Sequence, residues 1–395
     1  MIDDRTNIEE IGLLEKSTLA VRSGIGSDNQ YGSVIPPIFM STNFIFPQLG
    51  EIPKYDYSRS GNPTVEQLES TLSQLENGFG AIVTNSGTSA INLVLSTTLD
   101  SNSLVLVSKD CYGGTHRLFE ARQLKGDFNV RFVDTSNLDQ VQYYLEQRPK
   151  LIFIETPSNP LLKITDIEKI TSLAKYFDTK VVVDNTFLTP IYQTPLDLGA
   201  DFVVHSLTKF INGHSDCLAG AVICKHKEDF ESIKWWGNCI GSNTNSFDAF
   251  LTSRGLRTLS ARLKIHEFNT KRILNFFLNQ KVITKIYYPS LCSHDGHEIA
   301  SRQQKGFGSI ISCEFNLNSV QIEKFINSLQ LFSLAESLGG AESLVCHPAS
   351  MTHRAMENNA LKNAGISKNL LRFSIGIEDY EDLLSDLNRA LNLFK

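Results

Sequence analysis

No run of the sequence approaches the roughly 18–20 consecutive apolar residues that a membrane-spanning helix needs. The chain also has no CxxC pair, and its 7 cysteines are widely scattered. This pattern indicates reduced thiols and a cytoplasmic protein rather than a disulfide framework. The acidic start, MIDDRTNIEE, fits neither a secretory signal nor an arginine-rich transit peptide.

Long blocks of lysine or arginine are absent too, and the formal charge is −6. Both features argue against a protein that binds the phosphate backbone of nucleic acid. His294 and His297 flank Asp295 in a polar loop, but no other Cys or His pair has ligand spacing. No metal site is therefore expected.

What the chain does have is the composition of a globular protein, with 395 residues, 41% of them hydrophobic and 20% charged. This length predicts two or three domains. Residues 1–61 are rich in Gly, Pro, Ser and Asn and show little periodicity, which predicts an N-terminal arm. We expect an α/β domain over residues 62–255 and a smaller C-terminal α+β domain over residues 256–395.

Short β-branched runs alternate with amphipathic helical patterns from residue 62 onward. This alternation predicts βαβ units and a mainly parallel sheet. Helical patterns cover residues 65–77 and 164–177, and a long one covers 247–278. Farther on, residues 309–315 and 370–375 are strand-like, and residues 379–393 are helical. The strand-like runs of the first domain are residues 80–84, 104–108, 131–133, 151–154, 180–183, 201–204 and 221–224.

Several of these runs end in polar groups, and in open α/β sheets ligands bind outside the carboxyl ends of the strands. The first run leads into Ser86-Gly87-Thr88-Ser89 and then a helix, an arrangement that offers free N–H groups to a phosphate. An ordinary helix cap is the alternative interpretation. Neither a nucleoside-triphosphate loop nor a dinucleotide fingerprint is present.

Asp184 closes a Val-Val-Val run, and Lys209 follows the next apolar run. Taken singly, the carboxylate is typical of a cap and the amine of a surface charge. Together with Ser206 and Thr208 they match the needs of pyridoxal phosphate, which are a Schiff-base lysine, a carboxylate partner for the pyridine nitrogen and donors for the phosphate. Tyr112, at another strand end, would stack on the ring, and ordinary packing is the alternative.

Seven segments of the chain carry a resemblance to a known family, and they are Tyr57–Thr64, Glu155–Pro160, Val183–Thr186, Ser206–Lys209, Gly213–Asp216, Gln303–Gly308 and Ala335–Gly340. In these segments the chain resembles the trans-sulfuration enzymes of Cys/Met metabolism, which use pyridoxal 5'-phosphate, and the resemblance extends from Ala20 to about Leu387. Within that family it is most similar to the bacterial cystathionine γ-synthases. The resemblance implies a fold-type I enzyme, with a mainly parallel sheet in the large cofactor-binding α/β domain and a smaller α+β C-terminal domain. The likeness to the synthases rests on Asp110–Gly114, Gly255–Leu259, Arg302–Phe307 and Gly376–Asp379.

The resemblance also implies roles for the matching residues. Lys209 would hold the cofactor as a Schiff base and carry protons, Asp184 would pair with the pyridine nitrogen, and Tyr112 would stack on the ring. Asn159 would approach both the ring oxygen and the substrate. The phosphate would be bound by Gly87, Thr88, Ser206 and Thr208, together with Tyr57 and Arg59 of a neighbouring subunit. The family therefore implies a homotetramer whose active sites are shared between subunits.

For the substrate, the resemblance places the α-carboxylate at Arg372 and Ser337, because the planar fork of Arg binds a carboxylate through two hydrogen bonds. Glu336 would meet the substrate amine or its distal groups, with a solvated loop carboxylate as the alternative. Arg117 would supply a further positive group, or else lie on a helix surface. Ser60 and Val65 replace arginines found in relatives, and both differences bear on which ester is used.

The implied reaction is γ-replacement, in which an O-acylhomoserine and cysteine give cystathionine for methionine biosynthesis, with O-succinylhomoserine as the first choice of ester. The nearest alternative is elimination by a cystathionine γ-lyase or β-lyase on the same scaffold. Two others are a non-catalytic protein that binds the cofactor and a Schiff-base lysine enzyme without cofactor.

Overall fold

The computed structural model describes residues 14–353, 361 and 364–394. The chain divides into two compact units, one made of residues 1–97 and 202–260 and the other of residues 98–201 and 261–395. Each unit is therefore built from two separate stretches of sequence. The domain boundaries expected after residues 61 and 255 stay a prediction.

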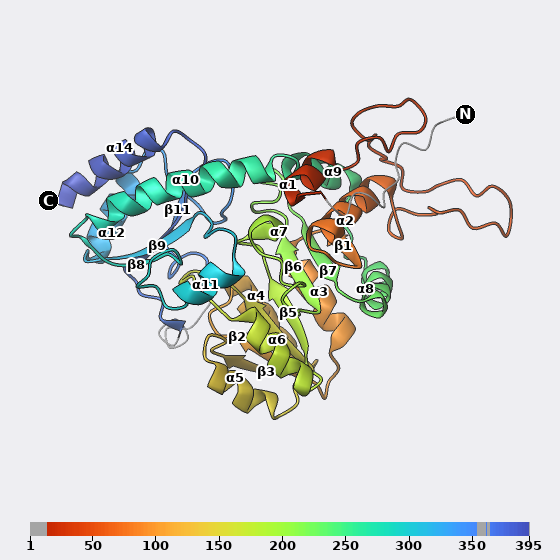
Figure 1. Ribbon diagram of the computed structural model, residues 1–395, viewed down its shortest axis with the longest axis horizontal. Coiled ribbons are helices and arrows are strands. Elements are labelled where there is room, and N and C mark those ends of the chain that lie inside the picture. Colours follow the sequence, from red (N-terminus) through yellow and green to blue (C-terminus); the bar gives the residue numbers. More distant parts are fainter. Residues whose placement is uncertain (1–13, 354–360, 362–363, 395) are drawn as a thin grey trace. The chain divides into compact units, whose positions relative to one another are not determined.

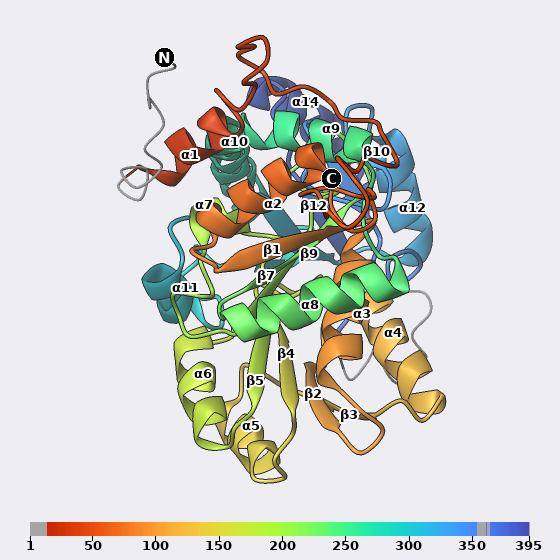
Figure 2. The same cartoon turned by 90° about the vertical axis from the view of Figure 1, so that its right-hand side faces the viewer.

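In the first unit, strand β7 (Gly220–Cys224) lies between β1 (Gly80–Thr84) and β6 (Phe202–Ser206) and is antiparallel to both. Every residue of β1 and β7 is buried, as expected for strands covered on both faces. Figure 2 shows α2 and α8 lying along β1. The helices of this unit are α1 (Lys16–Arg22), α2 (Pro63–Leu75), α3 (Gly87–Thr98), α8 (Lys227–Ile240) and α9 (Ser246–Leu256).

Residues 23–61 form loops that project beyond the sheet and helices of the first unit (Figure 1). Their attachment to α2 is polar, since the side chain of Asn62 caps this helix through Thr64 and donates to the carbonyl of Phe39 at 2.9 Å. Farther out the loops expose apolar side chains, among them Ile45 at 92% and Leu49 at 105%. The described part of the arm thus carries apolar surface that its own unit does not cover.

The second unit contains two sheets. Strands β5 (Lys180–Asp184), β4 (Leu151–Glu155), β2 (Leu104–Ser108) and β3 (Asn129–Val133) lie in that order and are all parallel. The other sheet has five strands in the order β10-β11-β12-β9-β8. Their bounds are β8 (Ile283–Tyr287), β9 (Ile310–Phe315), β10 (Ser333–Leu334), β11 (Leu344–Cys346) and β12 (Leu370–Ser374).

An aromatic core supports the five-stranded sheet. The ring of Phe373 on β12 lies 5.1 Å from that of Phe277 and 5.8 Å from that of Phe332. Amphipathic helices close this core on one face of the sheet. The helices of the unit are α4 (Gly113–Leu124), α5 (Leu138–Leu145), α6 (Ile167–Tyr176), α7 (Thr189–Tyr192), α10 (Leu259–Leu278), α11 (His297–Gln303), α12 (Ser319–Ser328) and α14 (Tyr380–Leu391), followed by the 3₁₀ turn η2 (Asn392–Phe394).

The predicted α/β class, with a mainly parallel sheet and a smaller second sheet, is confirmed. The single long helix predicted over residues 247–278 is wrong, because α9 ends at Leu256 and α10 begins at Leu259. The amide and the hydroxyl of Thr258 both donate to the carbonyl of Gly255, each at 3.1 Å. This tighter turn replaces the regular i→i−4 pattern and ends the helix. Among the described residues, no helix has the length and apolarity that crossing a bilayer requires.

Gly255 gives the first prediction, because a Cβ there would lie 2.1 Å from the backbone oxygen of Asn212. We expect Gly255→Ala to lower the free energy of unfolding by about 1–3 kcal/mol, since backbone must move to relieve the clash. Gly237→Ala is the matched control, because its Cβ would meet only side chains at 3.5 Å or more. This change in α8 should stabilise the protein by about 0.5–1 kcal/mol. Denaturant unfolding measures both, and a Gly255→Ala protein as stable as wild type would contradict the packing.

Candidate active site

The turn between β1 and α3 has the form expected of the predicted phosphate site. The hydroxyl of Ser86 accepts the N–H of Ser89 at 3.1 Å, which fixes the start of the helix. The first-turn N–H groups of Gly87 and Thr88 have no acceptor within the helix itself. They point, with the helix dipole, to where a phosphate would bind.

Close packing explains why this turn contains glycine. A Cβ on Gly87 would lie 2.7 Å from the Cβ of Ser206, at the end of β6. A Cβ on Gly220, at the start of β7, would lie 2.2 Å from the carbonyl oxygen of Ser86. The first unit therefore brings the predicted phosphate-binding residues of α3 and β6 together.

Lys209 follows β6 in a tight turn. Its N–H donates to the carbonyl of Ser206 at 3.3 Å, and its carbonyl accepts from Gly213 at 2.7 Å. The hydroxyl of Thr208 donates to the carbonyl of Ala219 at 3.2 Å and accepts the N–H of the same residue at 3.1 Å. Thr208 thus holds the turn that carries Lys209, in addition to its predicted contact with the phosphate.

Tyr57 and Arg59 lie on the arm of the first unit, and both are exposed. The guanidinium of Arg59 donates to the carbonyl and side-chain oxygens of Asn238, at 2.8 and 2.6 Å. Within its own chain, Arg59 is therefore held at the end of α8. The role predicted for both residues, at the cofactor of a neighbouring subunit, stays a prediction.

In the second unit, two carboxylates lie at the ends of neighbouring parallel strands. Asp184 ends β5 and is in register with Glu155, which ends β4. Asp184 accepts the N–H of Thr186 at 3.0 Å and is half-buried. It belongs to a different unit from Lys209, and the pairing of both residues with one cofactor stays a prediction.

Arg372 is a buried cation, only 2% exposed, in the middle of β12. Its Nη1 donates to Oδ1 of Asn159 at 2.8 Å, and its Nη2 donates to the carbonyl of Ser337 at 2.7 Å. Ser337 has φ 87°, a left-handed conformation that is rare outside glycine. The second unit thus brings together three of the residues predicted to bind the substrate.

Tyr112 is the residue just before α4, and its side chain remains 39% exposed. Partial burial raises the pKa of its phenol, and the negative charge of Glu336 raises this pKa further. The positive charges of Arg117 and Arg372 act in the opposite direction on the same pKa. The exposed Glu336 and Arg117 are therefore close enough to influence Tyr112 electrostatically.

Comparisons with known proteins show the family of the chain. Residues 17–392 match the family described as Cys/Met metabolism PLP-dependent enzyme, where PLP is pyridoxal phosphate. The chain belongs to this family. It is similar to cystathionine gamma-synthase of Escherichia coli, with 47% identity over 95% of this chain and 97% of that one. It is 41% identical to cystathionine beta-lyase of Lactococcus lactis subsp. cremoris, over 95% of this chain and 98% of that one.

A solved structure of a PLP family member is also similar along nearly the whole chain. This is cystathionine gamma synthase from Xanthomonas oryzae pv. oryzae in complex with aminoacrylate and cysteine, with a TM-score of 0.95 and 48% identity. The match covers 96% of this chain and 98% of that chain. The predicted membership in the trans-sulfuration family is confirmed, and so is the expectation of a PLP-dependent enzyme.

The cofactor of the family is pyridoxal 5'-phosphate, and the residues present fit it. The cradle at Gly87, which a Cβ would fill, offers backbone N–H groups to its phosphate. Lys209 has the amine for a Schiff base, and Asp184 has the carboxylate for a protonated ring nitrogen.

Two residues that contact the predicted site residues Tyr112 and Asn159 have no role in the sequence-based prediction. Glu155 accepts the backbone N–H groups of Tyr112 and Asn159, both at 2.8 Å. His353 is buried, and its Nε2 donates to the carbonyl of Asn159 at 3.2 Å. Burial, helped by the positive charge of Arg372, lowers the pKa of His353 to about 4, so its ring is neutral near pH 7. The place of Glu155 directly after an apolar run was a sequence signal that it could have a functional role. Nothing in the sequence around His353 distinguishes that residue.

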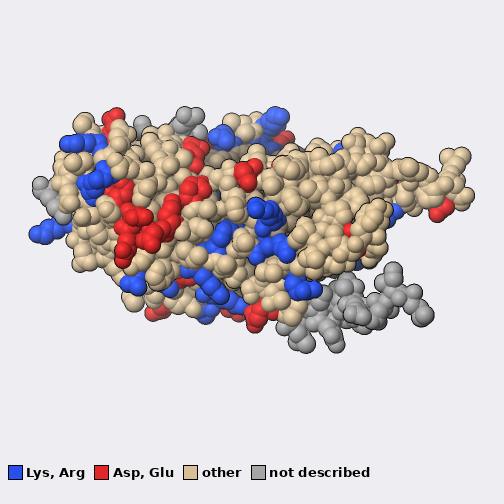
Figure 3. Space-filling model, turned by 90° about the horizontal axis from the view of Figure 1, so that it is seen from above, with Lys and Arg blue, Asp and Glu red and all other residues tan. Residues whose placement is uncertain are grey.

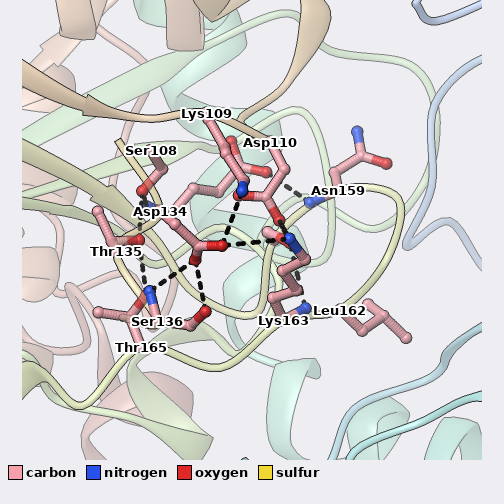
Figure 4. Close-up of polar contacts among 12 residues, drawn as sticks. Ser108, Lys109, Asp110, Asp134, Thr135, Ser136, Asn159, Leu162, Lys163 and Thr165 are labelled. Atoms are coloured by element: carbon pink, nitrogen blue, oxygen red, sulfur yellow. Dashed lines mark hydrogen bonds and ion pairs between the residues drawn. The ribbon is translucent and has the colours of Figure 1, made fainter. Parts of the chain in front are cut away.

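The loops that carry Tyr112 and Asn159 rest on a polar network at the ends of β2, β3 and β4 (Figure 4). Lys109 forms an ion pair with Asp134 at 2.8 Å. The amine of Lys163 lies 3.9 Å from a carboxylate oxygen of Asp134 and the same distance from one of Asp110. Asp110 also accepts the hydroxyl of Ser158 at 2.6 Å. Through Asp110, these contacts join the segment before Tyr112 to Ser158 and Lys163, on either side of Asn159.

Arg372 gives the second prediction. Arg372→Lys keeps the charge but replaces the planar fork by a single ammonium, which cannot reach Asn159 and Ser337 with the same geometry. We expect the KM for the amino-acid substrate to rise about 10-fold or more. Arg302→Lys is the control, because that side chain is 52% exposed and pairs with Asp166 at the start of α6. Steady-state kinetics on both variants would contradict the assignment if the two KM values changed equally.

Proposed function

We propose that this PLP-dependent enzyme is a cystathionine γ-synthase, which replaces the acyloxy group of an O-acylhomoserine by the sulfur of cysteine and releases the carboxylic acid. O-succinylhomoserine is the proposed ester, and cystathionine for methionine biosynthesis is the proposed product. The observation that carries the proposal is the 47% identity with the E. coli synthase along almost the whole of both chains. Exposed charges of both signs beside Tyr112 support it, because the substrates carry both charges.

The residues of the chain have distinct tasks in this proposal. When bound, the cofactor supplies an electron sink for the negative charge that forms at the substrate's Cα. The amine of Lys209 takes and returns the proton at Cα, and the carboxylate of Asp184 holds the proton of the ring nitrogen. The ring of Tyr112 would stack on the cofactor ring, and its phenol would assist the exchange of the Lys209 amine for the amine of the substrate.

Recognition of the substrate falls to the second unit. Arg372 binds the α-carboxylate, and Asn159 and Ser337 fix the orientation of its guanidinium. Glu336 attracts the amine of the substrate or of the incoming cysteine, and Arg117 attracts the carboxylate of the acyl group. Val65, where relatives have arginine, is buried in α2, which leaves Arg117 as the proposed cation for that group.

Elimination is the second candidate function. The beta-lyase of L. lactis is 41% identical over 95% of this chain, so a similar sequence is found in an enzyme that is named for elimination. Proton removal at Cα is common to both reaction types, and the buried residues of the site serve either one. Only the products distinguish the candidates.

The third prediction is a product assay on the purified holoenzyme. With O-succinylhomoserine and cysteine we expect cystathionine, and with cystathionine alone we expect only slow release of 2-oxobutanoate. Lys209→Ala should lower every turnover about 100-fold or more, because proton transfer at Cα loses its base. The same variant should lose the visible absorbance of the lysine-bound cofactor.

Other outcomes of this assay are equally informative. Faster release of pyruvate from cystathionine than formation of cystathionine would identify a β-lyase, and faster release of 2-oxobutanoate would identify a γ-lyase. A protein that binds the cofactor but converts none of these substrates would be non-catalytic. O-acetylhomoserine in parallel reactions tests the proposed ester.

Assembly into a homotetramer with shared active sites is part of the proposal. The exposed apolar side chains of the arm support it, because such surface is normally buried against a partner. The projecting end of the molecule also carries few charged side chains on the face seen in Figure 3. A cytoplasmic location is proposed as well, since all 7 cysteines are free thiols, which persist in a reducing compartment.

The fourth prediction concerns this assembly. Ile45→Asp with Leu49→Asp places charge where the arm would meet a second copy, so we expect sedimentation to show a shift from tetramer to smaller species. Leu124→Asp is the control, because this side chain at the end of α4 is 87% exposed but lies outside the arm. A tetramer that survives the double change, or one that Leu124→Asp dissociates as readily, would contradict the role of the arm.

A further inference from the structure

Glu155 is a buried carboxylate with two specific partners. It ends β4 and is only 5% exposed. Its Oε2 accepts the backbone N–H of Tyr112, and its Oε1 accepts the backbone N–H of Asn159, each at 2.8 Å. Each oxygen therefore binds a different loop, one after β2 and one after β4.

These two loops carry the groups that meet the substrate in the proposed function. Tyr112 directly precedes α4 and presents its ring from that position. Asn159 accepts from Arg372, which donates in turn to Ser337. Glu155 thus connects the aromatic residue to the arginine clamp through one carboxylate and one amide side chain.

We propose that Glu155 is a positioning residue, which sets the distance between Tyr112 and the Asn159–Arg372 clamp and thereby the affinity for the substrate's carboxylate. The inference rests on the proposed function for its substrate, but its structural part does not. Glu155 acts through Tyr112 and Asn159 and is not itself a catalytic residue.

The chemistry at this position favours a role in geometry over one in stability. Burying a carboxylate costs free energy, and here the negative charge of Asp184 lies at the end of the next strand. A neutral glutamine would avoid that cost, but its amide has a single acceptor oxygen. Only a carboxylate offers an acceptor to both N–H groups at once.

Hydrogen bonds that do not use the carboxylate hold the backbone of Glu155 in place. The N–H of Glu155 donates to the hydroxyl of Ser108 at 3.3 Å. That hydroxyl lies 2.9 Å from the hydroxyl of Thr135, which lies 2.8 Å from the hydroxyl of Thr165, in the chain of contacts seen in Figure 4. Since these contacts do not involve the Glu155 side chain, they remain when that side chain is changed.

A second tie between the same loops makes the inference testable. The hydroxyl of Ser158 donates to Asp110 at 2.6 Å, so the loops stay joined when one oxygen of Glu155 is lost. Glu155→Gln has the same shape and no charge, and we expect it to fold. Its NH₂ group would face one of the two backbone N–H groups, which frees that loop from its acceptor.

The experiment compares wild type, Glu155→Gln and a matched control as holoenzymes. The control is Asp386→Asn, because Asp386 is a buried carboxylate that accepts the backbone N–H groups of Gln330, Leu331 and Phe332. The measurements are amide hydrogen exchange of the segments 110–114 and 157–162, the melting temperature, and KM and kcat with O-succinylhomoserine and cysteine.

For Glu155→Gln we expect exchange to rise about 10-fold or more in at least one of the two segments, and the rest of the chain to remain unchanged. The KM should rise about 10-fold, and kcat should fall by a smaller factor. The reason is that the change displaces the Asn159–Arg372 clamp, which binds the substrate, and not Lys209, which moves the proton. For Asp386→Asn we expect a lower melting temperature with KM within about twofold of wild type.

Two results would overturn the proposal. One is a Glu155→Gln enzyme with wild-type KM, kcat and exchange in both segments. The other is faster exchange throughout the chain with a lower melting temperature, which would make the residue purely structural. If the wild type converts none of the substrates, the proposed function fails, whereas the exchange data still decide whether Glu155 fixes both loops.

Discussion

Buried backbone N–H groups and buried charges need partners, and this requirement organises the site in the second unit. The N–H groups of Tyr112 and Asn159 find theirs on the same carboxylate, that of Glu155. Arg372, almost fully buried, finds its acceptors on Asn159 and Ser337. These hydrogen bonds fix the side chains of Glu155, Asn159 and Arg372 before any substrate is present, so the proposed binding of a carboxylate by Arg372 would need little further ordering.

In the first unit the geometry is fixed in another way. Backbone segments there pack so closely that some positions have no room for a side chain. Gly87 and Gly220 each lie where a Cβ would strike the neighbouring strand end or turn. The turn after β1, which is the predicted phosphate site, is thus packed closely against the end of β6 and the start of β7. The turn of Lys209 is held by the hydrogen bonds of Thr208 to Ala219. A phosphate suits such a site because backbone N–H groups bind it without flexible side chains.

Much of the fold and of the candidate site could be predicted from the sequence. β-branched runs ending in Thr84, Ser108 and Val183 indicated the strands β1, β2 and β5, because local pattern and burial agree there. The break between α9 and α10 was missed, since it depends on the bonds of Thr258 to Gly255 within an otherwise continuous helical pattern. The link made by Glu155 was missed for a related reason, because both of its partners are backbone amides, which no residue pattern reveals.

Reaction type in this family cannot be decided by the buried frame. The roles proposed for Arg372, Asn159, Glu155 and Asp184 would serve any reaction that begins at Cα, whether replacement or elimination follows. Those reactions differ in what happens at the distal end of the substrate. Glu336 and Arg117 are both charged and exposed, and both influence Tyr112 electrostatically. Exposed residues can change without loss of the fold. Glu336 and Arg117 are therefore the positions at which substitution can most readily alter the choice between synthase and lyase chemistry.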